Sequence, residues 1–460
     1  MIEEIKRLEE LASPLEPGTA RRREVRNKVI SYTEEFLSNI RTIKAFDQSE
    51  DKGIGIFDSP VIDEPVDIDE ALKLLRKNVD VPGLNPASGG HLAYIPGGGI
   101  YYSSLGDYMA DIFNKYAGID YAGPGAVKLE NMLIEWMAGI VGYPKGAGGN
   151  LASGGSIANL IAVVTARDAH DLKAKDFDKT VVYLSEHVHH SIDKALRIAG
   201  LKESIKRHVP LDGHYRMVAG ELENAIITDR HNGLIPWLVI ASAGTTDVGA
   251  IDPISEIGDI TKKHKLWYHI DGAYGAFFAL LKEGREKLRG MEKSDSITMD
   301  PHKGLFLPYG LGAVLVKDKQ KLHNAHYYHA NYMQDAVSDV LSPAELSPEL
   351  TKHFRGLRMW LPLKLLGLKP FKACLEEKLM LAKYFYQKVQ EIGFHAELEP
   401  ELSVVTYKYV PVPKDTNLSA ETQKAKTNQF NKKLLKEVNK DGRVFISSTM
   451  LNGEFTLRLA

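Results

Sequence analysis

From about residue 86 onward, short β-branched or apolar runs alternate with longer stretches that have helical spacing. The runs that predict strands are Thr180–Leu184, Trp237–Ser242, Leu266–Ile270, Ser296–Met299 and Ala313–Val316. Helical stretches at Ser156–Ala169 and Ser191–Ala199 flank the first of these runs. Strands that alternate with helices predict a mainly parallel sheet with right-handed crossover connections. We therefore expect an α/β fold, in which ligands bind at the carboxyl ends of the strands.

The length of 460 residues is too great for a single core, so we expect two or three subdomains. Residues 1–85 are predicted to be an N-terminal helical segment and residues 86–350 the large α/β domain. Residues 351–460 are predicted to form a smaller α+β domain, with helices at Leu357–Leu366 and Leu375–Ile392. Because the last strand pattern runs to the end of the sequence, further residues beyond Ala460 are not excluded.

The composition argues against a nucleic-acid-binding protein, a membrane protein and a protein stabilised by disulfides. The net charge of −2 gives no footprint for nucleic acid, and no run of 18 apolar residues predicts a membrane span. The charged N-terminus lacks the apolar core of a signal peptide. Cys374 is the single cysteine, which excludes a disulfide within the chain and fits a reducing compartment. We expect a cytoplasmic protein that binds neither nucleic acid nor a membrane.

Residues 300–304, with the sequence Asp-Pro-His-Lys-Gly, place Lys303 between two predicted strands. Burial disfavours the charged form of a lysine, and a neutral lysine can form an imine with the carbonyl cofactor pyridoxal 5'-phosphate. The alternative is a lysine at a strand end that extends its charged group into solvent.

Residues 153–159, Ser-Gly-Gly-Ser-Ile-Ala-Asn, open a predicted helix. Glycines allow close approach of a ligand, and the first turn of a helix offers free N–H groups to a phosphate. Gly155 and Ser156 are therefore candidate phosphate ligands. The alternative is an ordinary serine at a helix start.

Three histidines, His187, His189 and His190, follow the strand at Thr180–Leu184. Neither a carboxylate-rich partner set nor a second cysteine accompanies them, so we expect no metal site. A histidine ring that stacks on a flat cofactor is the functional interpretation, and an exposed turn is the alternative.

Asp271 follows another predicted strand. A carboxylate that emerges from a buried strand needs a partner, and a protonated pyridine nitrogen is one such partner. Ala273, two residues later, is small enough to lie under a ring. Taken alone, this segment also fits a structural aspartate at a strand end.

Each of the four segments is a weak indication, but their order in one chain is much more specific. With these segments, the chain resembles the pyridoxal-phosphate-dependent group II amino acid decarboxylases from about Asn85 to Leu363, and more weakly to the C-terminus. The residues that carry the resemblance are 91–96 (His-Leu-Ala-Tyr-Ile-Pro), 153–159, 188–195, 244–246 (Gly-Thr-Thr), 269–274, 300–304 and 354–360 (Phe-Arg-Gly-Leu-Arg-Met-Trp).

The resemblance implies the type I fold of pyridoxal-phosphate enzymes and assigns roles to single residues. Lys303 would bond to the cofactor, Asp271 would pair with the pyridine nitrogen, and His189 and Ala273 would face the two sides of the ring. The residues implied near the phosphate or elsewhere around the cofactor are Gly155, Ser156, His302 and Thr246.

The resemblance also implies a homodimer with a shared active site, in which residues 1–85 pack on the partner. An apolar wall for the substrate would come from Tyr94, Ile95 and Pro96. Tyr332, in a region with several tyrosines, would return a proton to the substrate carbon. In relatives, phenylalanine at that position is associated with oxidative deamination to an aldehyde.

Two departures from the family pattern concern the lysine segment. The chain has Gly304 where aromatic-specific relatives usually carry a bulky residue. It has Asp300 where asparagine is common, and we expect this carboxylate to point away from the phosphate or to pair with a cation.

The resulting hypothesis is a lyase, a carboxy-lyase that converts an L-amino acid, preferably aromatic, to its amine and carbon dioxide. Alternatives with the same cofactor are decarboxylation of an acidic or aliphatic amino acid, cleavage of a carbon–carbon bond in a phosphorylated amino alcohol or other amino compound, or a transaminase-like reaction. A binding protein that keeps the fold without the chemistry is the alternative from another class.

Overall fold

The computed structural model describes residues 1–49, 52–95, 97–327, 341–412 and 419–460. Two compact units make up the chain. The first unit consists of Met1–Leu92 with Lys433–Ile446, and the second unit of Ala93–Lys432 with Ser447–Ala460.

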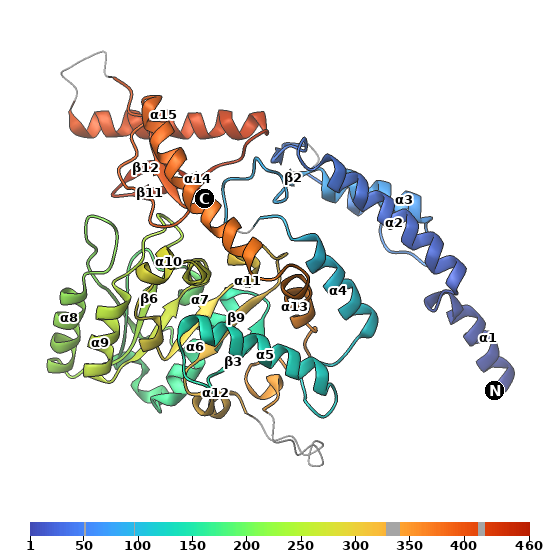
Figure 1. Cartoon of the computed structure of the whole chain (residues 1–460), viewed down its shortest axis with the longest axis horizontal. Coiled ribbons are helices and arrows are strands. Elements are labelled where there is room, and N and C mark those ends of the chain that lie inside the picture. Colours follow the sequence, from blue (N-terminus) through green and yellow to red (C-terminus); the bar gives the residue numbers. More distant parts are fainter. Residues whose placement is uncertain (50–51, 96, 328–340, 413–418) are drawn as a thin grey trace. The chain divides into compact units, whose positions relative to one another are not determined.

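A seven-stranded sheet is the centre of the second unit (Figure 1). Its strand order is β3-β9-β8-β7-β6-β4-β5. The strands are β3 (Gly148–Ala152), β4 (Thr180–Leu184), β5 (Ile205–His208), β6 (Ile235–Ser242), β7 (Trp267–Asp271), β8 (Ser296–Met299) and β9 (Gly312–Val316).

Neighbouring strands from β8 to β5 run parallel, and β9 is antiparallel to both of its neighbours. In this register Asp271 lies beside Ser242 of β6 and Thr298 of β8. The carboxyl ends of β3, β4, β6, β7 and β8 therefore meet at one edge of the sheet, next to the start of β9.

Helices cover both faces of this sheet, because its strands are apolar on both sides. One core lies under α6 and α7, and a larger core lies under α5, α8, α9 and α14. The α-helices between Ala93 and Glu391 are α4 (Tyr101–Phe113), α5 (Pro124–Val141), α6 (Gly155–Ala169), α7 (Ser191–Ile198), α8 (Ala219–His231), α9 (Ile254–His264), α10 (Lys282–Lys287), α11 (Pro301–Gly304), α12 (Lys319–His326), α13 (Gly356–Leu366) and α14 (Lys369–Glu391).

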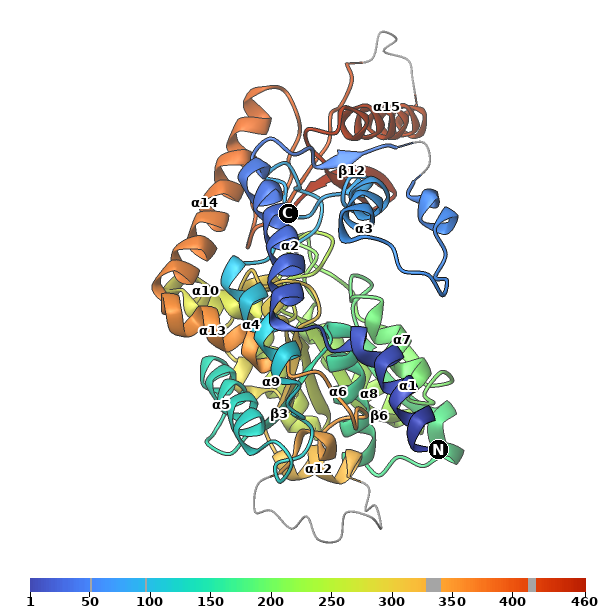
Figure 2. The same cartoon turned by 90° about the vertical axis from the view of Figure 1, so that its right-hand side faces the viewer.

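A small antiparallel sheet joins β10 (Val405–Tyr407), β12 (Glu454–Leu459) and β11 (Ser447–Leu451), with β12 in the middle. Helix α15 (Ala420–Asp441) lies beside it (Figure 2). Asn428 of α15 accepts from the Phe455 amide at 2.8 Å and donates to the Gly453 carbonyl at 3.0 Å.

The first unit contains α1 (Ile2–Ala12), α2 (Thr19–Asn39) and α3 (Ile68–Leu75), with a short pairing of β1 (Phe46–Asp47) and β2 (Gly83–Leu84). Ion pairs join α2 to α3 and the turn after it, with 2.7 Å between Lys28 Nζ and Asp69 Oδ2 and between Arg76 and Glu35. Shorter helical turns of the chain span Ser13–Leu15, Ile54–Asp58, Arg76–Asp80, Ala174–Lys179, Ala276–Leu280, Met291–Lys293 and Pro343–Glu345.

The structure confirms the α/β class, the mainly parallel sheet and each of the predicted strands of the large domain, with ends that shift by at most two residues. Helix α14 begins at Lys369 instead of Leu375, because Pro370 is tolerated in the first turn of a helix. The domain boundaries at residues 85 and 350 remain predictions. Among the described helices, none is long and apolar enough to cross a lipid bilayer.

One buried ion pair ties α5 to the start of α13. Lys352 Nζ lies 2.9 Å from Glu130 Oε2, and the two side chains are 0% and 2% exposed. Lys352 also donates to the Asn150 side-chain oxygen and the Leu151 carbonyl, each at 3.1 Å, and Glu130 accepts from the Gly356 amide at 3.0 Å. Loss of one partner would leave the other charge buried and uncompensated.

We predict that Glu130→Gln lowers the free energy of unfolding by about 3–5 kcal/mol, since it keeps the side-chain volume and removes only the charge that balances Lys352. Urea unfolding followed by circular dichroism measures the effect. Glu391→Gln is the matched control, because its partner Lys388 is exposed, and its unfolding midpoint should equal that of the unmodified protein. Equal midpoints for both variants would contradict the assigned role.

Candidate active site

The four segments that the sequence singles out meet at the carboxyl edge of the seven-stranded sheet. Gly155 and Ser156 begin α6 after β3, and His189 lies in the turn between β4 and α7. Asp271 is the last residue of β7, and Lys303 lies on the single turn α11 between β8 and β9. Parallel strands present their carboxyl ends at one edge, which is why segments far apart in the sequence converge here.

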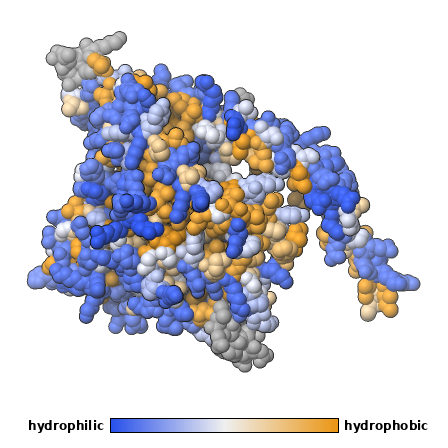
Figure 3. Space-filling view, in the orientation of Figure 1, coloured by the Kyte–Doolittle hydropathy of each residue, from blue (hydrophilic) through white to orange (hydrophobic). Residues whose placement is uncertain are grey.

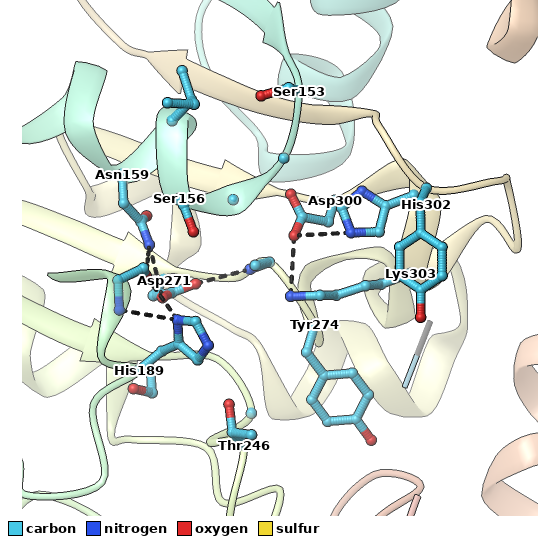
Figure 4. Close-up of a pocket in the computed structure, with 18 of the residues that line it drawn as sticks. Ser153, Ser156, Asn159, His189, Thr246, Asp271, Tyr274, Asp300, His302 and Lys303 are labelled. Carbon is cyan, nitrogen blue, oxygen red and sulfur yellow. Dashed lines mark hydrogen bonds and ion pairs between the residues drawn. The ribbon is translucent and has the colours of Figure 1, made fainter. Parts of the chain in front are cut away.

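These residues surround a cavity of about 440 Å³ (Figure 4). That volume lies in the range of small-molecule sites. The lining residues are Ser153, Gly154, Gly155, Ser156, Ile157, Asn159, His189, Ser191, Ser242, Gly244, Thr245, Thr246, Asp271, Ala273, Tyr274, Asp300, His302, Lys303, Tyr309 and Gly310.

Asp271 is 8% exposed, and its carboxylate is held from two sides. Oδ2 accepts a hydrogen bond from Asn159 Nδ2 at 3.0 Å, and Oδ1 accepts one from the Ala273 amide at 3.2 Å. A carboxylate has about four lone-pair sites, so each oxygen can accept a further bond from a donor in the cavity.

Lys303 points into the cavity beside a second carboxylate. Its Nζ lies 3.0 Å from Asp300 Oδ2, and the side chains are 22% and 1% exposed. Burial by itself lowers the pKa of Lys303, but Asp300 and Asp271 outweigh it and hold that pKa above its ordinary value. The expectation that Asp300 pairs with a cation is confirmed.

His302 contacts the same carboxylate less closely, with 3.7 Å between His302 Nε2 and Asp300 Oδ2. Its Nδ1 donates to the Leu311 carbonyl, and burial lowers the pKa of the ring. The neutral ring therefore has no proton on Nε2. His302 can donate to an anion only after it takes up a proton.

His189 lies across the cavity from Lys303 and Asp300, next to Asp271 (Figure 4). Its Nδ1 is 2.7 Å from Ser191 Oγ. Burial lowers the pKa of His189 and outweighs the nearby Asp271 carboxylate, so the ring is neutral at pH 7. Within the described part of the chain, no group of three or more His, Cys, Asp and Glu side chains could hold a metal ion.

Two glycines, at the start of α6 and the start of β9, leave no room for a Cβ. A Cβ on Gly155 would lie 2.8 Å from Asp300 Oδ2, and a Cβ on Gly312 would lie 2.6 Å from Gly154 Cα. The backbone at the start of α6 is therefore open to the cavity, and a helix N-terminus favours a phosphate.

These features fit pyridoxal 5'-phosphate. A flat ring needs a carboxylate at one end and a phosphate cradle at the other, and Asp271 and Gly155 line the same cavity. The lysine is within the cavity as well. One feature opposes the binding of an anion nearby: Asp300 Oδ1 is buried and has no hydrogen-bond partner among the residues that the structure describes. The ammonium of Lys303 offsets this charge.

Most of the predicted site residues line the cavity, including Thr246, Ala273 and His302. Its described lining does not include Tyr94 or Ile95; Tyr94 is 50% exposed, and Ile95 packs on the larger core. Pro96 and Tyr332 lie outside the described residues.

Sequence reasoning assigned no role to Asn159, Ser191, Tyr309 or Arg458. Asn159 is the polar residue within the apolar run 157–164 of α6, which is an indication that could have been used. Arg458 comes from β12, and its Nε donates to the Thr246 carbonyl at 2.7 Å. Only the folded chain brings that strand to the cavity loop.

Comparison with known proteins gives a consistent picture. The family model described as the pyridoxal-dependent decarboxylase conserved domain matches residues 61–410. An aromatic-L-amino-acid decarboxylase of Bacillus atrophaeus is 34% identical over 396 residues, which cover 85% of this chain and 80% of that protein. A phenylacetaldehyde synthase of Arabidopsis thaliana is 30% identical over 417 residues, covering 86% and 82%.

The fold of this chain also matches the folds of solved structures. The crystal structure of Oryza sativa TDC with PLP and tryptamine matches with a TM-score of 0.90, over 97% of this chain and 94% of that one. The two sequences are 23% identical, so this match shows a similar fold and no more.

We predict that Asp300→Asn lowers the pKa of Lys303, because the nearest carboxylate that favours the ammonium is lost. More of the lysine is then neutral at pH 8. In the cofactor-free protein, trinitrobenzenesulfonate should modify Lys303 several-fold faster, as measured by mass spectrometry of the peptide. Glu391→Gln, at an exposed pair, should leave this rate unchanged. An unchanged rate in Asp300→Asn would contradict the assigned coupling.

Proposed function

The chain belongs to the pyridoxal-dependent decarboxylase family, and from this we propose that it removes the carboxylate of an L-amino acid to give an amine and carbon dioxide. The observation that carries the proposal is the single cavity that holds Lys303, Asp271 and His189 together with the open start of α6. Pyridoxal 5'-phosphate is the cofactor of the family, and it supplies the electron sink for the bond that breaks.

Each residue has a proposed task toward the cofactor. Lys303 attaches it covalently, and Gly155 and Ser156 hold its phosphate, with His302 in protonated form. Asp271 accepts a hydrogen bond from the protonated ring nitrogen of the cofactor. This bond raises the pKa of that nitrogen by about one to two units and so favours its charged form. His189 and Ala273 lie on the two faces of the cofactor ring, and Thr246 lies in a loop beside that ring.

The substrate carbon needs a proton after carbon dioxide has left. We propose Tyr332 for this task, on the resemblance alone. Because phenylalanine at this position is associated with aldehyde formation in relatives, tyrosine favours the amine as product. The similarity to a phenylacetaldehyde synthase makes the aldehyde an outcome that the assay must detect.

An aromatic substrate is favoured by the chemistry of the cavity. The described lining has no arginine, and its basic side chains are Lys303, His189 and His302, which have other proposed tasks. An acidic substrate side chain would therefore lack a partner. The rings of Tyr274 and Tyr309 belong to the lining, and Tyr94, Ile95 and Pro96 are proposed to add an apolar wall.

We further propose a homodimer with a shared active site, in which residues 1–85 pack on the partner. Helix α4 exposes an apolar face, visible as the orange area over α4 in Figure 3. Its members at helical spacing are Tyr101, Leu105, Tyr108 and Ile112, each at least 38% exposed. Helix α1 buries no residue, and its Ile2, Ile5, Leu8 and Leu11 are more than half exposed. Apolar faces of this kind are typical of subunit interfaces. A cytoplasmic location remains a prediction.

The function is tested with the purified protein, supplied with pyridoxal 5'-phosphate, and a panel of L-amino acids. We predict carbon dioxide and the amine from at least one of phenylalanine, tyrosine, tryptophan and dihydroxyphenylalanine, with glutamate and aspartate as the acidic comparison. Lys303→Ala should abolish turnover. An aldehyde with ammonia would assign the chain to the aldehyde-forming branch, and no carbon dioxide from any amino acid would overturn the proposal.

The dimer is tested by light scattering. We predict twice the chain mass for the unmodified protein and the mass of one chain for the double variant Leu105→Asp, Ile112→Asp, because two carboxylates cannot be buried without partners. Leu381→Asp, at an exposed apolar position on α14, is the control and should keep the dimer mass. A monomer of the unmodified protein would contradict the interface.

A further inference from the structure

Alternate residues of β7 place three polar side chains on one face of the sheet, as the period of a strand requires. They are Trp267, His269 and Asp271, which are 2%, 1% and 8% exposed. Asn159 of α6 packs against this row and is 1% exposed. Buried polar groups need partners, so the hydrogen bonds of this row can be assigned completely.

The chain of bonds begins at a group that can only donate. Trp267 Nε1 donates to Ser296 Oγ at 2.9 Å. The Ser296 hydroxyl can donate its own proton to His269 Nδ1, which is also 2.9 Å away. Burial lowers the pKa of His269 to about 4, so at pH 7 the ring is neutral. Its Nε2 faces Asn159 Oδ1, an oxygen that can only accept, so the ring proton is on Nε2. That proton is donated to Asn159 Oδ1 at 3.1 Å.

The orientation of Asn159 is fixed by a group that can only accept. The Asp271 carboxylate requires the amide nitrogen of Asn159 to face it, at 3.0 Å. The same nitrogen donates to Ser191 Oγ at 3.0 Å, and Asn159 Oδ1 also accepts from the Thr298 hydroxyl at 2.6 Å. Both donors and both acceptor sites of this amide are therefore used.

The chain ends at His189. The Ser191 amide donates to His189 Nδ1 at 3.3 Å, so that nitrogen carries no proton. The Ser191 hydroxyl accepts from Asn159 and donates to the same Nδ1 at 2.7 Å. The proton of the neutral His189 ring is consequently on Nε2, the nitrogen that Ser191 does not contact.

We propose that Asn159 is a positioning residue that sets the orientation of Asp271 and, through Ser191, the tautomer of His189 as one unit. Among the side chains of this hydrogen-bond network, the Asn159 amide is the one that contacts both Asp271 and Ser191. Its meaning for catalysis rests on the proposed function, because His189 and Asp271 are the groups expected beside the cofactor ring. The hydrogen-bond assignment itself holds for the cofactor-free protein.

Nitrogen NMR of the cofactor-free protein, labelled with ¹⁵N-histidine, tests the assignment directly. Resonances of His189 and His269 are assigned from His189→Gln and His269→Gln. We expect both rings to be neutral at pH 7 with the proton on Nε2. A proton on Nδ1 of either ring would overturn the proposal, and this measurement requires no change at Asn159.

The variant Asn159→Asp keeps the shape of the side chain but cannot donate to Asp271 or Ser191. Two adjacent carboxylates favour uptake of a proton, and we expect His269 to become cationic at pH 7. Fluorescence titration with pyridoxal 5'-phosphate should show affinity that is at least about 10-fold weaker, corresponding to about 1.4 kcal/mol.

Asn431→Asp is the matched control. Asn431 is also fully buried, and its amide nitrogen donates to the Tyr409 and Thr427 carbonyls, away from the cavity. It should leave the histidine resonances and the cofactor affinity unchanged. A neutral His269 and unchanged affinity in Asn159→Asp would overturn the role of Asn159. Failure of the proposed function would appear separately, as an inactive enzyme with the expected tautomers.

Discussion

A carboxylate buried at the end of a central strand is the constraint around which this site is organised. A carboxylate that is only 8% exposed, as Asp271 is, is costly to keep charged unless hydrogen-bond donors surround it. The donors come from Asn159 on a neighbouring helix and from the Ala273 amide in its own turn. Once these bonds are made, the carboxylate has one orientation, and its free lone pairs face the cavity that Lys303 also enters.

The charged groups of the cavity are the carboxylates of Asp271 and Asp300 and the ammonium of Lys303. Lys303 is paired with Asp300, and the open start of α6 adds the positive end of a helix dipole. The two histidines of the lining, His189 and His302, are neutral at pH 7, because burial lowers the pKa of both rings. A ligand with a phosphate at one end and a protonated ring nitrogen at the other complements this arrangement. One oxygen of Asp300, Oδ1, is buried and has no hydrogen-bond partner within the described parts of the chain.

Much of the sheet could be predicted because β4, β6, β7, β8 and β9 are short apolar runs between helical patterns. The strands that sequence reasoning missed have a different composition. β3 reads Gly-Gly-Asn-Leu-Ala, β5 carries two basic residues and a histidine, and β11 begins Ser-Ser-Thr. Glycine and polar residues lower strand propensity, and here pairing with neighbouring strands overrides it. The same holds for Arg458, whose contact with the Thr246 carbonyl depends on the position of β12.

The sequence by itself determined the class of fold and the chemical groups of the site. Local patterns are enough to place Lys303, Asp271 and the glycines before α6 at the ends of predicted elements, where a parallel sheet gathers them. Tertiary structure decided the proton positions and the charge partners. The orientation of Asn159, on which the proton positions depend, is set by Asp271 Oδ2 at 3.0 Å and by the Thr298 hydroxyl at 2.6 Å, and both groups are more than 100 residues away in the sequence. Spacing along the chain does not encode such approaches, because they arise only when the sheet and its helices pack.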